Sequence, residues 1–292
     1  MSLEGPAAPS ALGRLRRHES FLVYHRFRWL KVACVAAALA ILLYAVAAPY
    51  GSRYGGSWAG YTLGTAAALL ILWLIWFGYR KRSYRTNQGN LVARLSAHVY
   101  LGLALLVVAT LHTGLHFGWN VHTLAYALMC LVIVSGAVGV FCYARLPRLM
   151  TENRHGTAMP QMLGRIASLD DQLSSAALAA DDKTARLVER AMETTTIGGT
   201  LRQQLSGRFP DCATAAALAG IGEPGADTPP EQDRAIRQVR LLLQEKARLL
   251  DRARRDIRYK ALLDIWLYFH IPLSFALLAA LLAHIVAVFY LW

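Results

Sequence analysis

The stretch from Leu91 to Phe117, LVARLSAHVYLGLALLVVATLHTGLHF, decides the fold of this chain. A helix needs about 20 apolar residues to cross the hydrocarbon core of a bilayer, and this stretch is long enough. Its only charged residue is Arg94, near its start, whereas His98 and His112 lie within the apolar run. Ionisable groups at such depth are costly and are usually tied to function. The stretch therefore predicts a membrane-spanning helix, and each imidazole taken alone could be a hydrogen-bonded core residue, part of a proton path or a ligand.

The composition of the whole chain supports this interpretation. Hydrophobic residues make up 55% of the 292 residues and charged residues only 17%, whereas a soluble protein carries about 25% charged residues. No Asp or Glu occurs between Ser20 and Thr151. These observations exclude a soluble globular fold. The net charge of +13 is explained by basic cytoplasmic loops of a membrane protein, so we expect membrane lipid and no nucleic acid as a partner.

Four further segments are apolar enough to span a membrane, and they define the predicted domains. The predicted fold class is an all-α integral membrane protein: a five-helix transmembrane bundle with a cytoplasmic helical-hairpin insert between helices four and five. The predicted spans besides the quoted one are Leu30–Ala48, Trp58–Phe77, Val121–Tyr143 and Ala261–Leu291. The domains are then a cytoplasmic tail (1–29), helices one to four (30–144), the insert (145–260) and helix five (261–292), which joins the same bundle.

The distribution of basic residues predicts the orientation of the bundle. Six Lys or Arg residues lie in the chain up to Lys31 and five between Arg80 and Arg94, but the loop after the first span has only Arg53. Because cytoplasmic loops accumulate Lys and Arg, the N-terminus and the insert are expected in the cytoplasm, with the bundle in a bacterial-type inner or plasma membrane. Spans three and five then both run outward and are parallel.

The insert, residues 145–260, holds 19 of the 31 basic residues. Apolar residues recur at steps of three and four from Ile236 to Ile257, and the stretch from Pro160 to Glu193 is also helix-prone. Between them, Phe209–Asp233 is rich in Ala, Gly and Pro and is expected to be a loop. We predict a helical hairpin whose second arm continues into span five. It could dock a partner or be a self-packed stalk.

Two pairs of histidines share one spacing. His98 and His112 are 14 positions apart in span three, as are His270 and His284 in span five. This spacing is close to four turns, so each pair lies on one helix face with about 21 Å between its members. Because the two spans are predicted to be parallel and the depths match, His98 can face His270 and His112 can face His284.

Facing imidazoles at two depths predict two bis-histidine haem sites stacked across the membrane. Neutral imidazoles can ligate iron from both sides, which leaves no open position and favours electron transfer over oxygen binding. The predicted cofactors are two haem b, and the metal ligands are His98, His270, His112 and His284. The cysteines show no C-x-x-C or C-x-x-C-H spacing, so we expect no iron–sulfur cluster and no covalent c-type haem.

The paired H-x13-H motifs resemble the transmembrane domain of the ferric reductase and NADPH-oxidase superfamily. The resemblance covers Leu91–Tyr143 and Ala261–Trp292. The first two spans correspond to the family only in their number. It implies a dihaem b-type cytochrome that carries electrons from a cytoplasmic donor to an outer acceptor. The sequence departs from the family in its long insert, and it has no G-x-G-x-x-G after a strand-like run. We therefore expect no flavin, and a donor that is a separate polypeptide or a quinol.

Three residues near the predicted ligands have open roles. Arg94 could pair with a haem propionate or simply anchor the helix at the cytoplasmic surface. Gly114 could give a porphyrin clearance or serve as a small-residue helix contact. His116 could replace His112 as ligand, contact a propionate or the acceptor, or be an ordinary interfacial histidine. All three are candidate cofactor-binding residues, and no residue is predicted to be catalytic.

The favoured function is a membrane cytochrome b, the electron-transfer subunit of an oxidoreductase, whose insert receives other subunits of a redox complex or a soluble electron carrier. An alternative keeps the haems in a quinol- or quinone-reactive membrane anchor, with Asp264, Tyr268 and His116 as candidate quinone neighbours. A transporter or signalling protein with a histidine proton path is a third alternative. It gains little support because the first four spans lack acidic residues.

Overall fold

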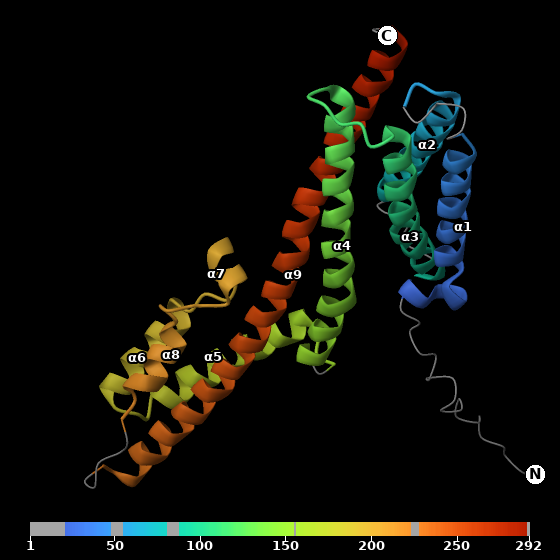
Figure 1. Cartoon of the computed structure of the whole chain (residues 1–292). Helices are drawn as coiled ribbons and strands as arrows, with labels where there is room; N and C mark the ends of the chain where they lie inside the picture. Colours follow the sequence, from blue (N-terminus) through green and yellow to red (C-terminus); the bar gives the residue numbers. More distant parts are fainter. Residues whose placement is uncertain (1–20, 48–54, 81–87, 155, 223–227, 291–292) are drawn as a thin grey trace, which may run out of the picture. The chain divides into compact units, whose positions relative to one another are not determined.

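The structure is a computed structural model that describes residues 21–47, 55–80, 88–154, 156–222 and 228–290 (Figure 1). The predicted tail up to residue 20 and residues 81–87 of the predicted basic loop lie outside this part. Regular structure within the described ranges is helical throughout, with no strand. The helices are a short 3-10 turn, Phe21–Val23, then α1 (Tyr24–Ala47), α2 (Trp58–Arg80), α3 (Gln88–Thr113), α4 (Val121–Arg154), α5 (Met159–Ala177), α6 (Asp182–Glu193), α7 (Leu201–Ser206), α8 (Ala213–Gly220) and α9 (Pro230–Tyr290).

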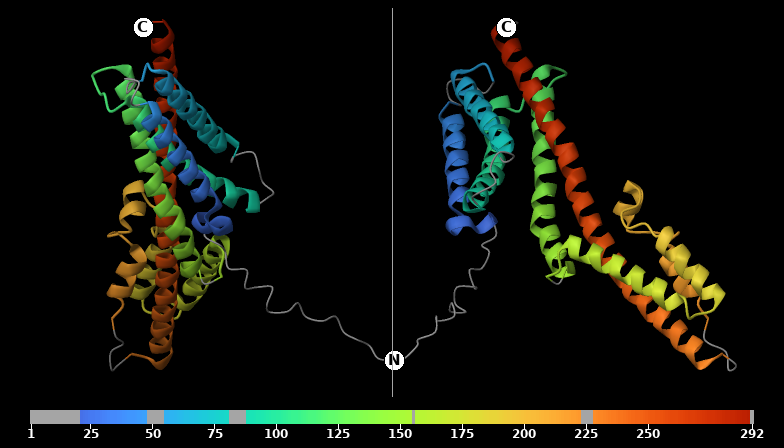
Figure 2. Two further views of the ribbon diagram at one scale, coloured as in Figure 1. Left: turned by 45° about the vertical axis from the view of Figure 1, so that its right-hand side comes forward. Right: turned by 180° about the vertical axis from the view of Figure 1, so that it is seen from behind.

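The chain divides into two compact units. Unit 1 comprises Met1–Val140 and Tyr268–Trp292, and unit 2 comprises Phe141–Leu267. Two helices, α4 and α9, contribute to both units because each continues well beyond its apolar part. Figure 2 shows both helices as unbroken ribbons from two further directions.

Five described helices are long and apolar enough to cross a membrane: α1, α2, α3, α4 and α9. These are the five segments that the sequence predicts, with different ends. Helix α3 ends at Thr113, not Phe117, since Gly114 and Leu115 adopt positive φ angles of 57° and 63°. A left-handed glycine directly after the last helical residue is a common helix terminator. The polar insert does not interrupt α9, whose apolar part follows directly on its charged part, as predicted.

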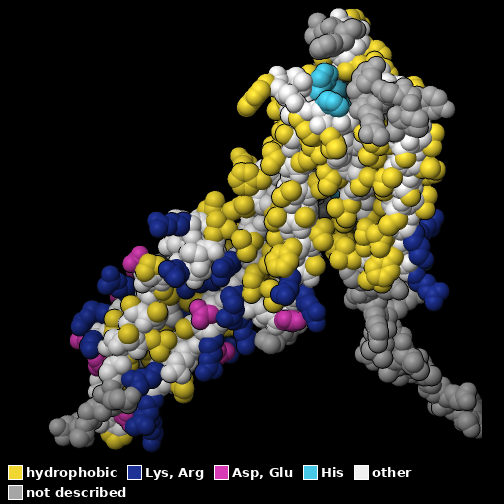
Figure 3. Space-filling model, in the orientation of Figure 1, with side chains coloured by type: hydrophobic (Ala, Val, Ile, Leu, Met, Phe, Trp, Pro, Cys, Tyr) yellow, Lys and Arg dark blue, Asp and Glu magenta, His cyan; other side chains and the backbone are white. Residues whose placement is uncertain are grey.

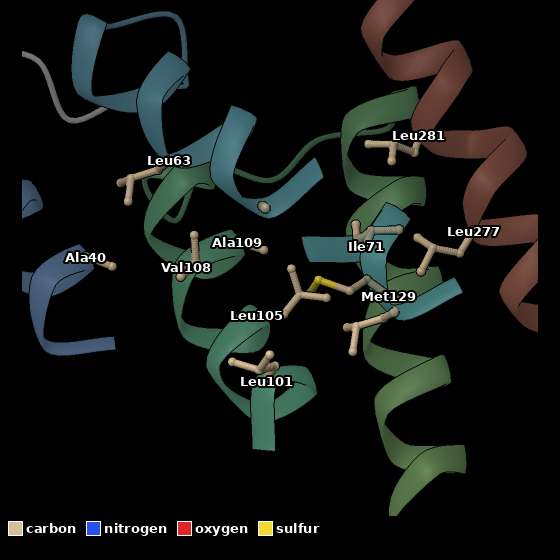
Figure 4. Close-up of a cluster of buried hydrophobic side chains, with 12 residues drawn as sticks. Ala40, Leu63, Ile71, Leu101, Leu105, Val108, Ala109, Met129, Leu277 and Leu281 are labelled. Carbon is tan, nitrogen blue, oxygen red and sulfur yellow. The ribbon is translucent and has the colours of Figure 1, made fainter. Parts of the chain in front are cut away.

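The core of unit 1 is built around α3, the most buried of the five helices. Buried side chains of α1, α2, α3, α4 and α9 form one apolar cluster, in which Leu105 of α3 and Met129 of α4 point toward each other (Figure 4). By contrast, large apolar side chains elsewhere on these helices are exposed, including Leu69 at 62% and Val134 at 62%. Figure 3 shows hydrophobic side chains over most of the visible face of unit 1. An apolar surface of this extent suits contact with lipid.

Unit 2 has a separate core and a charged surface (Figure 3). Helices α5, α6, α8 and the first part of α9 bury a cluster that includes Leu173, Val188, Ala217 and Leu243. The predicted loop over Phe209–Asp233 is wrong in part, because α8 forms within it. Its sequence, ATAAALAG, is rich in alanine, the best helix former, and Ala217 is buried in the cluster. The insert is therefore more elaborate than a two-armed hairpin.

An ion pair ties the end of α4 to α9 within unit 2. Arg154 donates from Nε and one terminal nitrogen to both carboxylate oxygens of Asp256, at 2.6 to 3.1 Å. The Asp256 side chain is only 2% exposed, whereas Arg154 is 36% exposed. Hydrogen bonding to this carboxylate raises the pKa of Arg154. Neighbouring Asn153 donates to the carbonyl of Arg252 and accepts from Arg255, so both residues link the two helices.

We predict that replacing the exposed partner, Arg154, lowers the free energy of unfolding more than replacing the buried partner, Asp256. Arg154→Leu leaves a buried, unpaired carboxylate and should cost about 3 kcal/mol, the low end for a broken buried pair. Asp256→Leu leaves an arginine that water can reach, so it should cost less. Thermal unfolding of the purified protein followed by circular dichroism measures both effects.

The matched control is Arg148→Leu, which breaks the exposed pair between Arg148 and Glu152 on α4. Exposed pairs contribute about 0–1 kcal/mol, so this variant should melt close to the wild type. An Arg154→Leu protein that melts like the Arg148→Leu protein would contradict a structural role for the buried carboxylate.

Candidate functional site

Two of the predicted ligands face each other across unit 1. His112, near the end of α3, and His284, near the end of α9, have ring centroids 6.0 Å apart and ring planes at 90°. Both side chains are half-buried. We call this pair the His112 level, and the pair of His98 and His270 the His98 level. The His112 level thus has the juxtaposition that the shared spacing predicts.

The Nδ1 atoms of both imidazoles at the His112 level are held by neighbouring helices. His112 Nδ1 lies 2.8 Å from the carbonyl oxygen of Gly60 in α2. His284 Nδ1 lies 2.5 Å from Nδ1 of His122, the second residue of α4. With Nδ1 engaged on both rings, Nε2 is the nitrogen left to act as a ligand. The sequence alone did not assign a role to His122, although its place at the start of a span was visible.

A glycine of α2 makes room for the His112 imidazole. A Cβ atom added at Gly64 would lie 2.6 Å from Cε1 and 2.9 Å from Nδ1 of His112. Real Cβ atoms do not approach so closely, so a larger residue at position 64 would displace the ring. The sequence did not predict this contact, because it identified α2 only as one of five spans.

At the His98 level, His270 is held from α4. Its Nδ1 lies 3.1 Å from Oγ of Ser135, and a Cβ atom added at the next residue, Gly136, would lie 3.8 Å from its Cε1. Ser274, one turn along α9, donates to the carbonyl of His270 instead of to its ring. His98 is half-buried on α3, beside the buried Ala97. Its spacing from His112 on an unbroken α3 follows the prediction.

The three accessory candidates lie in different settings. Arg94 is half-buried on α3, one turn before His98, so its predicted propionate role stays a prediction. Gly114 is buried and its positive φ angle ends α3, which gives it a conformational role independent of any cofactor. His116 lies beyond the end of α3 and is exposed. His116 is therefore not one helical turn on from His112, and its role stays a prediction.

The dimensions of the His112 level can be compared with those of a bis-histidine iron site. A metal–imidazole bond is about 2 Å, which puts the ligating nitrogens of two opposed imidazoles about 4 Å apart and their ring centroids about 6 Å apart. The centroids of His112 and His284 are 6.0 Å apart, and the edge of the His112 ring formed by Nδ1, Cε1 and Nε2 lies against Gly64 of α2. Within the described residues, no cluster of three or more His, Cys, Asp or Glu side chains could hold a metal ion.

Comparison with known proteins finds no matching family model, no matching curated protein and no matching solved structure.

We predict that Gly64→Ala disturbs the His112 level. The new methyl group would overlap the imidazole, and overpacking of this kind costs about 1–3 kcal/mol. Gly102→Ala on α3 is the matched control, because a Cβ atom there meets nothing within 4 Å. The control should be neutral or stabilising by up to about 1 kcal/mol, since alanine is the better helix former. Melting temperatures of the two variants in detergent provide the test, and equal values would show that Gly64 has no special role.

Proposed function

We propose that this chain is a b-type dihaem membrane cytochrome that relays electrons across a bilayer as the membrane subunit of a larger redox complex. In this proposal α1, α2, α3, α4 and α9 form a five-helix transmembrane bundle, and the insert and the N-terminus are cytoplasmic. The observation that carries the proposal is the opposed pair His112 and His284, with ring centroids 6.0 Å apart. A haem bound there would supply reversible one-electron chemistry.

The residues of the chain would hold the cofactor and fix its electronic environment. Imidazoles ligate iron in the neutral form, and a hydrogen bond at Nδ1 selects the tautomer with a free Nε2. At the His112 level, the carbonyl of Gly60 provides this bond for His112. Gly64 leaves the space that the ring needs. A hydrogen-bonded core histidine would have the same two features, so the ligand role of His112 is argued from the facing ring of His284.

The equal spacing of the histidines extends the proposal to a second haem. His98 and His270 lie 14 positions before His112 and His284 on their own helices. Both helices are unbroken over this interval, so the two levels are about 21 Å apart along each axis. A hydrocarbon core is about 30 Å thick, which means that two such levels would divide the membrane. His98 and His270 are therefore proposed as the ligands of the second haem.

The insert is proposed to receive the electron donor. Unit 2 has its own core and carries most of the charged residues of the chain. A folded, charged cytoplasmic unit built on the continuation of two spans is suited to docking a soluble carrier or another subunit. Charge complementarity of such surfaces mainly increases the association rate.

A quinone-reactive anchor is the second candidate. Tyr268 lies two residues before His270 on α9 and is 77% exposed, and its neighbour Phe269 is 67% exposed. A phenol group on a surface that would face lipid could meet a membrane-dissolved quinone close to the His98 level. In this function the haems would be the same and only the redox partner would differ.

We predict that the purified protein shows split b-type α-bands after reduction with dithionite. His112→Ala and His284→Ala should each remove the same haem, and His98→Ala and His270→Ala the other, because each haem needs both ligands. Haem-to-protein ratios and difference spectra measure the loss. Tyr126→Phe is the control, since the Tyr126 hydroxyl contacts Thr110 and no imidazole. A stable, colourless wild-type protein would eliminate both haem functions.

The relay and the quinone anchor predict different reductants. In proteoliposomes, a quinol analogue should leave the haems of a relay oxidised, whereas a co-purifying subunit or soluble carrier should reduce them. Reduction by the quinol alone, abolished in Tyr268→Phe or Tyr268→Leu, would replace the relay by the quinone anchor.

A further inference from the structure

Helix α4 contacts both histidines of α9 and carries neither of the paired motifs. In unit 1 it lies beside α9 (Figures 1 and 2). His122 of α4 meets His284, and Ser135 of α4 meets His270, in each case at the Nδ1 atom of the ring. The two α4 residues are 13 positions apart and the two α9 residues 14. One helix thus supplies a polar partner at each of the two levels.

These contacts are directed at the rings. Ser135 Oγ is 3.1 Å from His270 Nδ1, and the adjacent Gly136 allows α4 to approach the ring closely. His122 Nδ1 is 2.5 Å from His284 Nδ1, with ring centroids 4.6 Å apart. At the His112 level, the α3 ligand is held differently, by a backbone carbonyl of α2. The polar partners of the two α9 rings are therefore side chains, which substitutions can change.

We propose that α4 is a positioning helix, in which His122 and Ser135 fix the tautomer and orientation of His284 and His270 as haem ligands. This inference rests on the proposed dihaem function. For Nε2 to ligate, the proton of each neutral ring must lie on Nδ1. His284 then donates to Nδ1 of His122, whose own proton lies on Nε2, and His270 donates to Oγ of Ser135. Both residues touch a ligand and are positioning residues, not ligands.

The two partners should affect the two levels differently. A hydrogen bond accepted from Nδ1–H makes the ligating imidazole more basic. An imidazole nitrogen is a stronger hydrogen-bond acceptor than a hydroxyl oxygen. His122 should therefore raise the basicity of His284 Nε2 more than Ser135 raises that of His270 Nε2. Greater ligand basicity favours the oxidised iron, which lowers the reduction potential. The reduction potential of the haem at the His112 level should therefore depend more strongly on its α4 partner than that of the haem at the His98 level.

The experiment compares the full-length wild type with variants in detergent, each checked for helical circular dichroism. His122→Leu should raise the midpoint potential of one haem, change its low-temperature electron paramagnetic resonance signal and weaken its retention about 10- to 100-fold. Ser135→Ala should raise the potential of the other haem. The conservative variants His122→Gln and Ser135→Thr keep an acceptor and should restore wild-type behaviour. Tyr126→Phe and Ser274→Ala are controls, since those hydroxyls contact Thr110 and the His270 carbonyl.

The possible failures are distinguishable. Wild-type protein that retains no haem overturns the proposed function and the inference with it. Two haems that keep wild-type potentials and signals in both His122→Leu and Ser135→Ala overturn the inference alone, as do variants that change the same haem. Nitrogen-15 resonances of labelled histidines in the fully reduced haem-bound protein, whose low-spin ferrous sites are diamagnetic, give an independent readout of the tautomer. They should place the His284 proton on Nδ1 in the wild type and lose that preference in His122→Leu.

Discussion

The need to place imidazoles in an apolar interior is the constraint on which the rest of unit 1 depends. A polar group removed from water must find a partner in the protein, and in an apolar core each unpaired group is costly. Two helices, α2 and α4, meet this need around the paired motifs. The backbone of α2 serves His112, and two side chains of α4 serve His284 and His270. The central position of α3 and the close approach of Gly64 and Gly136 follow from the same need.

The arrangement also explains why small residues lie next to the histidines. An imidazole can be wedged between helices only where the neighbouring backbone has no Cβ in its way. Gly64 meets this condition at the His112 level, with less room to spare than Gly136 has near His270. Elsewhere in unit 1 the helices pack mainly through apolar side chains, together with hydroxyl contacts such as that between Thr110 and Tyr126. A polar contact from a neighbouring helix and a close glycine coincide at His112 and at His270, which is the physical basis for treating these histidines as a site.

Unit 2 differs from unit 1, because its helices carry many charged residues and also bury an apolar core. Lys246 is 1% exposed and is satisfied by Asp170 and by the carbonyl of Ala191. Arg254 is 8% exposed, donates to the carbonyl of Thr196 and lies over the ring of Phe209. Each buried charge is paired or hydrogen-bonded, as burial of a charge requires. These contacts join α9 to α5, to α6 and to the loops that carry Thr196 and Phe209.

The sequence by itself determined the helical class, the five apolar segments and the 14-residue spacing, because hydrophobicity and helical periodicity are local properties of the chain. It did not predict where α3 ends, because the apolar run continues past Gly114 to Phe117, although a glycine at this place is a common helix terminator. It also missed α8, where alanine propensity and burial outweighed the Gly and Pro signals around it. Only the tertiary structure brought Gly60, Gly64 and His122 to the His112 level and Ser135 to His270. These contacts join residues far apart in the chain, and no local pattern encodes which helices become neighbours.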